Sequence, residues 1–219
     1  MKTLKIFLAS GLILATLTAC TSKTTTNSRT KTSVTPAESL QSNIPATMKT
    51  TPEKGDTIAV LTTNMGEIKV LLYTKDVPET AKNFAELAKE KKYDGTIFHR
   101  VINNFMIQGG DFENRNGTGG YTYKGKGTRL KDEINPNLSH IRGALSMANS
   151  GAHTNSAASQ FFIVQNPKGT KFLDGDYAIF GYAYEGMDVV DQIAATKTDG
   201  GDKPLEDIVL EKVEIKTQE

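Results

Sequence analysis

Residues 98–112 read Phe98-His99-Arg100-Val101-Ile102-Asn103-Asn104-Phe105-Met106-Ile107-Gln108-Gly109-Gly110-Asp111-Phe112. This stretch places one arginine among aromatic and aliphatic residues and a glutamine two residues after a methionine. Because side chains alternate between the faces of a strand, Arg100 and Ile102 are predicted to share one face. After a turn at 103–104, Met106 and Gln108 share a face in the same way. A cation, an amide and apolar surface can thus gather into a peptide groove, without a nucleophile or a metal cage.

Composition excludes several classes of function. The 219 residues suffice for one domain with a substantial core and additional segments. The formal net charge is +1, and removing the first twenty residues, which hold two lysines and no acid, changes it to 24 − 25 = −1. Such a balance gives no electrostatic footprint for nucleic acid. One cysteine excludes an intrachain disulfide, and three scattered histidines argue against a metal site of several His and Cys ligands, so neither a metal nor a cofactor is expected.

Residues 1–20 are predicted to be a targeting segment. Lys2 and Lys5 precede an apolar run over residues 6–17, which is short for a membrane span. The segment ends Leu17-Thr18-Ala19-Cys20, which resembles a bacterial lipoprotein signal. A lipid on Cys20, with acyl chains such as palmitate, would anchor the protein to the extracytoplasmic face of a membrane. The alternative is an ordinary secretory signal that is cleaved near Ala19.

Residues 21–55 are predicted to be a disordered tether. They are rich in Thr, Ser, Lys and Asn and contain almost no large apolar residues. Such a segment cannot bury enough surface to offset the entropy of ordering. As a flexible chain it would span about 30–35 Å. The folded domain is predicted to occupy residues 56–219.

Within that domain, the first elements are a hairpin and a helix. Apolar residues alternate around Asn64-Met65-Gly66, which predicts two strands joined by a turn. The sequence Asp76-Val77-Pro78-Glu79 is typical of a helix N-terminus, and this helix is expected to reach about Lys92. Its predicted apolar stripe is Ala81, Phe84, Ala85 and Ala88.

The rest of the domain is predicted to be mainly strands and glycine-rich loops. Strands are expected at 144–148, 160–165, 177–184 and 208–215, the last with a bulge near Glu211-Lys212. A short helix is expected at 187–195, and residues 114–127 favour a solvent loop over a phosphate-binding loop. Many short strands with two helices indicate an antiparallel β-barrel. The hydrophobic pattern alone leaves a barrel and a sandwich about equally favoured.

Four blocks of sequence resemble the motifs of the cyclophilin family of peptidyl-prolyl cis–trans isomerases. The family's order is kept, and the resemblance covers roughly residues 57–216. It implies an isomerase with a closed eight-stranded β-barrel capped by a helix at each open end. The four blocks are residues 98–112, Gly143 to Ser150, Ser159 to Ile163, and Phe172 to Gly175 leading to Ile179-Phe180-Gly181.

The resemblance also implies which residues form the site. Arg100 would be the catalytic donor, although an arginine can also be a structural partner of a carboxylate. His99 should point away from the site, as a packed or supporting residue. Phe105, Met106, Phe162 and Leu173 would line a proline pocket, although core packing is the ordinary role of such residues. The residues expected to hold or flank the substrate are Gln108, Ala148, Asn149, Ser150 and Gln160.

Three departures from the family pattern bear on specificity. Phe172 stands where many members have a tryptophan that binds cyclosporin, so weak cyclosporin binding with activity retained is expected. Tyr177 stands where eukaryotic members often carry a histidine, and a tyrosine can still form a pocket wall. The loop Gly151–Ser159 is two residues longer than usual and lies beside the groove.

Three functional hypotheses follow. The first is a lipid-anchored, monomeric prolyl isomerase that acts on proline-containing segments of exported proteins. The second is a non-catalytic chaperone or adhesion module that binds proline-containing peptides. The third, a solute-binding lipoprotein of a transporter, would need alternating strands and helices in two lobes, which the pattern lacks.

Overall fold

A computed structural model describes residues 44–219, which form a mainly β unit. The predictions for residues 1–20 and for most of the tether fall outside this part of the chain. Within it lie nine strands, two α-helices and one 3-10 turn. The elements are β1 (Thr57–Thr63), β2 (Gly66–Leu72), α2 (Pro78–Lys89), β3 (Thr96–Ile97), β4 (Arg100–Ile102), β5 (Met106–Gly109), β6 (Ala144–Met147), β7 (Phe161–Val164), η1 (Lys171–Leu173), β8 (Ile179–Glu185), α3 (Met187–Ala194) and β9 (Val209–Thr217).

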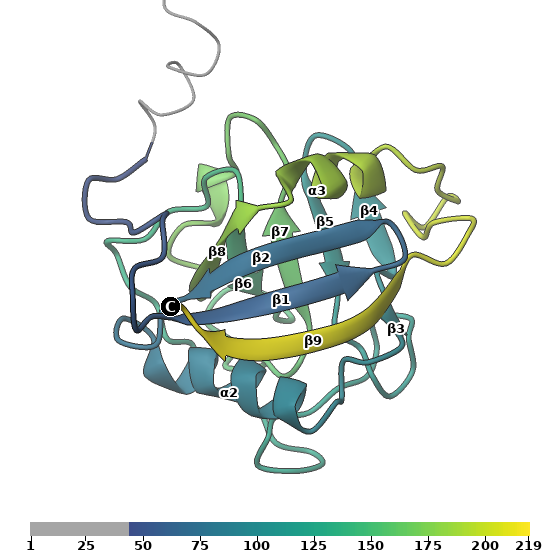
Figure 1. The fold of residues 1–219 in the computed structure, drawn as a ribbon. Coiled ribbons are helices and arrows are strands. Elements are labelled where there is room, and N and C mark those ends of the chain that lie inside the picture. Colours follow the sequence, from purple (N-terminus) through teal and green to yellow (C-terminus); the bar gives the residue numbers. More distant parts are fainter. Residues whose placement is uncertain (1–43) are drawn as a thin grey trace, which may run out of the picture. The chain divides into compact units, whose positions relative to one another are not determined.

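One curled antiparallel sheet contains all nine strands (Figure 1). Their order is β3-β9-β1-β2-β8-β6-β7-β5-β4. The predicted mainly β fold with two helices is confirmed, whereas a closed barrel of eight strands is not. The edge strands β3 and β4 lie at opposite ends of this order, although they follow each other in the chain. Residues 98 and 99, which separate them, belong to no strand.

The predicted hairpin is present and joins β1 to β2. Thr63 pairs with Gly66, so Asn64 and Met65 form a two-residue turn between β1 and β2. On the other side of β1, Thr62 pairs with Lys212 and Thr63 with Leu210, which leaves one extra residue in β9. The predicted bulge near 211–212 is therefore confirmed.

Helix α2 begins as predicted but is capped by a distant residue. Its N-cap is Val77, whose side chain makes no capping hydrogen bond. Glu133 accepts hydrogen bonds from the N–H of Thr80 at 2.9 Å and of Glu79 at 3.4 Å. The helix ends at Lys89, short of the predicted Lys92, because the chain turns into the left-handed region at φ 57° two residues later.

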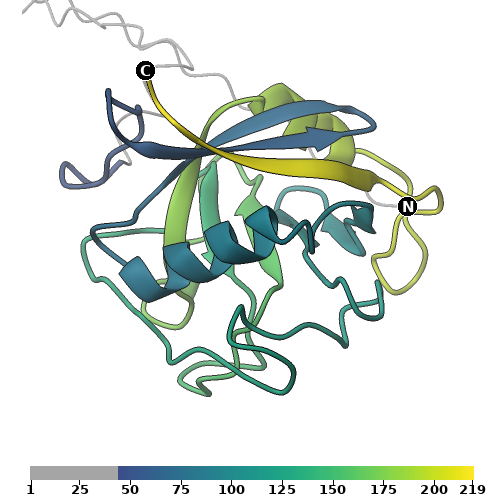
Figure 2. The same cartoon turned by 60° about the horizontal axis from the view of Figure 1, so that its bottom comes forward.

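The two helices cover the ends of the curled sheet. Figure 2 shows α2 across the lower end, while α3 lies against β2 at the upper end in Figure 1. All four residues of the predicted stripe of α2 are buried. Phe84 contacts the rings of Phe161 and Phe180, with ring centroids 5.4 and 5.3 Å apart. These contacts tie α2 to the strand that carries part of the site.

Ordered contacts begin before the predicted domain boundary at residue 56. Met48 is 5% exposed and belongs to the core. The Tyr73 hydroxyl donates to the carbonyl of Lys49 at 2.6 Å, and the Lys49 ammonium lies 2.6 Å from Asp56. The end of the predicted tether therefore packs on the domain. No helix within residues 44–219 has the length and apolar character needed to cross a membrane.

Candidate active site

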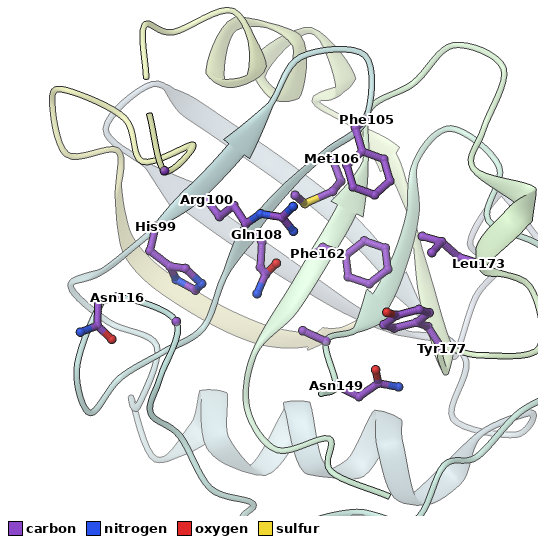
Figure 3. A pocket seen from close by; sticks show the side chains of 13 residues that line it. His99, Arg100, Phe105, Met106, Gln108, Asn116, Asn149, Phe162, Leu173 and Tyr177 are labelled. Carbon is purple, nitrogen blue, oxygen red and sulfur yellow. The ribbon is translucent and has the colours of Figure 1, made fainter. Parts of the chain in front are cut away.

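The site is built on one row of residues that crosses four neighbouring strands. Arg100 in β4 pairs with Gln108 in β5, which pairs with Phe162 in β7, which pairs with Ser146 in β6. Directly opposed residues of an antiparallel sheet share a face. Figure 3 shows Arg100, Gln108 and Phe162 directed to the same side. Ile102 likewise pairs with Met106. The face predicted for Arg100 and Ile102 and the face predicted for Met106 and Gln108 therefore form one surface.

A cavity of about 350 Å³ opens over this row (Figure 3). Its size is that of an ordinary small-ligand pocket. Nine of the residues predicted for the site line it. They are Arg100, Phe105, Met106, Gln108, Ala148, Asn149, Phe162, Leu173 and Tyr177.

One end of the cavity is apolar. Met106 and Phe162 are buried beneath it, and Phe105 and Leu173 form parts of its wall. The ring of Tyr177 stands nearly perpendicular to that of Phe162, with centroids 5.9 Å apart. The tyrosine thus forms a pocket wall, as expected. Such a surface suits a compact apolar ring such as proline.

A partly buried hydrogen-bond network holds this wall in place. The carboxylate of Asp174 accepts from the Ser139 hydroxyl at 2.6 Å and the His140 backbone N–H at 2.7 Å, and it contacts His140 Nδ1 at 2.7 Å. The imidazole of His140 stacks on Phe162, with planes 10° apart. Burial lowers the pKa of His140, although Asp174 opposes this effect. The network fixes the segment that carries Leu173 and Tyr177 against the pocket floor.

Arg100 is partly tethered and partly free. Its Nε lies 3.4 Å from Asp202 Oδ2, and its side chain is 42% exposed. Within residues 44–219, Nη1 and Nη2 have no hydrogen-bond partner. The alternative role as a structural partner of a carboxylate therefore applies to one nitrogen alone. The two terminal nitrogens remain available to a ligand at the edge of the apolar pocket.

A chain of amides continues from the arginine along the groove. Gln108 Nε2 donates to Gln160 Oε1 at 3.1 Å. Gln160 Nε2 donates in turn to the carbonyls of Gly117 and Gly119, at 3.0 and 2.8 Å. This chain couples the strand face to the glycine-rich loop. Gln160 therefore holds both the loop and Gln108 through hydrogen bonds. Together with Ser150, it also lines a neighbouring cavity.

Asn149 lines the groove and has free backbone groups. Its side chain is occupied, because Nδ2 donates to the carbonyl of Asp176 at 3.0 Å and Oδ1 accepts from the N–H of Gly151 at 3.0 Å. In the described part of the chain, its own N–H and C=O have no partner. A free N–H beside a free C=O suits the pairing of an extended peptide.

Four residues of the cavity lining were not predicted: His99, Asn116, Gly117 and Gly201. The expectation that His99 points away is wrong, although it is packed, at 6% exposed. Strand alternation does not extend to it, because His99 lies in the break between β3 and β4. Burial lowers its pKa and the Arg100 charge lowers it further, while Asp111 opposes. Both ring nitrogens lack partners among the described residues.

Asp111 shapes the loop that carries Asn116 and Gly117. This fully buried carboxylate accepts five backbone N–H groups. Burial raises its pKa, but the hydrogen bonds outweigh burial, and the pKa lies below its ordinary value. The five donors, at 2.9–3.2 Å, belong to Glu113, Asn114, Asn116, Gly117 and Gly119.

Phe172 is the predicted site residue that lies outside both cavities. Its side chain is 73% exposed, and it stacks on Phe105 with centroids 5.9 Å apart. It therefore extends the rim of the groove rather than the pocket.

Within residues 44–219 no group of three or more His, Cys, Asp or Glu side chains is placed to hold a metal.

The chain matches a model of the family described as cyclophilin type peptidyl-prolyl cis-trans isomerase/CLD, over residues 57–215. The peptidyl-prolyl cis-trans isomerase-like 1 of Rhizopus delemar is 50% identical over 66% of this chain and 84% of its own length. That of Mus musculus is 44% identical over 69% and 88%.

Solved structures show the same likeness. A cyclophilin type peptidyl-prolyl cis-trans isomerase of Cryptosporidium parvum superposes with a TM-score of 0.70 and 34% identity, over 75% of this chain and 99% of that one. A second crystal structure of it, in the presence of the dipeptide Ala-Pro, gives a TM-score of 0.68 over 74% and 99%.

Proposed function

The chain belongs to the cyclophilin-type family and is a peptidyl-prolyl cis–trans isomerase, and from this premise we propose that Arg100 is its catalytic donor. Rotation about an Xaa–Pro bond meets a barrier of about 18–20 kcal/mol, because twisting the amide breaks its resonance. Uncatalysed exchange takes tens to hundreds of seconds. An enzyme lowers this barrier by binding the twisted amide better than either planar form. No covalent intermediate is required.

The observation that carries the proposal is the position of the arginine. Its terminal nitrogens are free at the edge of an apolar pocket, and Nε is anchored by Asp202. As the amide twists, the prolyl nitrogen regains a lone pair that a fixed donor can stabilise. A guanidinium stays charged at every physiological pH and presents a rigid donor fork. Arg100 therefore acts without proton transfer, and His99 is assigned no acid–base role.

The other groups of the groove hold the peptide. Proline occupies the pocket formed by Phe105, Met106, Phe162 and Leu173, with Tyr177 as a wall. Gln108 binds near the prolyl carbonyl. The free N–H and C=O of Asn149 pair with the residue before proline, with Ala148 and Ser150 beside it. These assignments rest on the resemblance to the family's motifs and on the cavity lining, and for Asn149 also on its unpaired backbone groups.

A protease-coupled assay on short Xaa–Pro peptides tests this function. The full chain should accelerate exchange, and Arg100→Ala should lose most of the acceleration. Lys171→Ala, which removes a cation beside the groove in η1, is the matched control and should retain it. A folded protein without acceleration would instead favour a non-catalytic module that binds proline-containing peptides.

For the place of action, we propose an extracytoplasmic membrane face with a lipid on Cys20. The support is the sequence of residues 1–20 alone, because the family match begins at residue 57. The relatives named above are eukaryotic and lend it no support. The substrates would then be exported proteins. Independently of the location, a monomer is the default proposal for the assembly state. Partition of the full chain into the detergent phase, lost in Cys20→Ala, tests the anchor.

A further inference from the structure

The connection between α3 and β9 folds into a closed loop, residues 197–205, beside the proline pocket. Its two ends are joined, because Leu205 donates its N–H to the carbonyl of Lys197 at 2.9 Å. Asp199 fixes the tip, because its Oδ1 accepts two backbone N–H groups of the loop, at 2.8 and 3.0 Å. Gly201 of this loop lines the pocket. The loop is therefore an ordered part of the site.

Asp202 connects this loop to β4 through its backbone and through its side chain. Its carbonyl accepts the N–H of Val101 at 2.8 Å, and its Oδ2 lies 3.4 Å from Nε of Arg100. Among residues 44–219 it supplies the one carboxylate that lies within 4 Å of this guanidinium. The backbone contact holds the edge strand, so the carboxylate is left to act on the arginine.

The backbone of Asp202 adopts a conformation that a glycine would adopt more easily. Its φ is 64°, in the left-handed region that disfavours residues with a Cβ. The two preceding residues, Gly200 and Gly201, are glycines whose φ lies outside that region. The loop thus places an aspartate where a glycine fits without strain. Because strained positions of this kind gather at functional sites, the side chain of Asp202 needs a functional explanation.

The contact with Arg100 supplies that explanation. An arginine side chain loses much rotamer freedom when it is ordered, and this one is partly exposed. A carboxylate at Nε restricts the side chain and leaves Nη1 and Nη2 unoccupied, whereas a pairing at the terminal nitrogens would occupy them. Figure 3 shows the guanidinium directed toward the apolar end of the pocket. A donor that is oriented in advance stabilises a developing lone pair most effectively.

We propose that Asp202 is a positioning residue of the isomerase: its carboxylate orients Arg100 toward the twisted amide, and it contacts no substrate itself. The proposal rests on the catalytic role proposed for Arg100. Because Asp202 acts through an interaction made in the transition state, its loss should lower kcat and leave KM nearly unchanged.

Asp202→Gly in the full chain is the main test, because glycine removes the carboxylate, suits the backbone and keeps the carbonyl that Val101 contacts. The midpoint of urea unfolding should stay the same or rise. The kcat on an Xaa–Pro peptide should fall by about two- to fivefold, the range of an exposed ion pair. A purely structural residue would instead lose stability when it is replaced.

Two further variants separate charge from shape. Asparagine also tolerates the left-handed region and offers an oxygen to Nε without a charge, so the kcat of Asp202→Asn should lie between those of the glycine variant and the unchanged protein. Asp207→Asn is the matched control. Asp207 is similarly exposed, pairs with Lys203 at 3.9 Å and does not line the proline pocket, so this variant should keep its kcat.

Two measurements report on the contact itself. The NMR signal of the Arg100 Nε–H group, recorded without substrate, should move in Asp202→Gly and stay in place in Asp207→Asn. Exchange spectroscopy then completes a double-mutant cycle. Added to Arg100→Ala, Asp202→Gly should lower the residual rate no further, because the two residues act as a unit.

The proposal is overturned if Asp202→Gly keeps its full kcat, if its kcat and stability fall together, or if it lowers the rate equally in the Arg100→Ala background. A full kcat in Asp202→Gly beside a large loss in Arg100→Ala would refute the positioning role and leave the proposed function intact. A full rate in Arg100→Ala would refute the proposed function, and the positioning role with it.

Discussion

Replacing Asp111 with asparagine should loosen the loop that forms one side of the groove. The carboxylate accepts five backbone N–H groups, two on Oδ1 and three on Oδ2. Asparagine has one acceptor oxygen, so it can serve three of these groups at best. The other two would face its NH₂ group, which cannot accept them.

The magnitude follows from those two donors. A buried donor without a partner costs about 1–3 kcal/mol. Because the loop is partly exposed, we expect a total loss of about 2–4 kcal/mol in the free energy of unfolding. With a urea slope of roughly 2 kcal/mol/M, the midpoint of unfolding should fall by about 1–2 M.

Urea unfolding and steady-state kinetics measure the two consequences. Since Asn116 and Gly117 line the cavity, KM for a peptide should rise, whereas kcat should change less because Arg100 is untouched. Asp132→Asn is the matched control. That half-buried carboxylate accepts one backbone N–H, from Asn155 at 2.9 Å, which the side-chain oxygen of an asparagine can also accept. A midpoint and a KM equal to those of the unchanged protein would refute the role assigned to Asp111.

Two further predictions concern pH and drug binding. Burial lowers the pKa of His140, so the stability that its neutral form contributes is present above its unfolded pKa of about 6.5 and is lost as the pH falls through the folded value. Denaturation curves between pH 8 and 5 should show this loss of unfolding free energy, and His140→Asn should reduce its dependence on pH. The same pH dependence in the variant would contradict the assignment. Phe172→Trp should strengthen cyclosporin binding in a calorimetric titration with little change in kcat, and unchanged affinity would show that Phe172 does not limit it.

The sequence predicted the parts of the site that depend on local alternation. Arg100, Met106 and Gln108 lie within two short strands joined by a tight turn, so spacing along the chain fixes their shared face. The hairpin and the bulge in β9 follow from the same kind of pattern.

The rest depends on contacts between distant segments or on breaks in regularity. His99 lies between two strands, where alternation gives no direction for its side chain. Glu133 caps a helix that begins more than fifty residues earlier, and Asp202 contacts Arg100 from a loop 102 residues later in the chain. Asp111 lies in the predicted stretch, but its role depends on a loop conformation that composition does not specify.

The most direct test of the central claim separates binding from exchange in Arg100→Ala. NMR titration of an Ala-Pro-containing peptide gives its affinity, and NMR exchange spectroscopy gives the catalysed rate of isomerisation. If the arginine stabilises the twisted amide, the rate should fall by about a hundredfold or more, while the affinity for the planar peptide changes by a few-fold. An unchanged rate, or a loss of affinity as large as the loss of rate, would contradict the proposed mechanism.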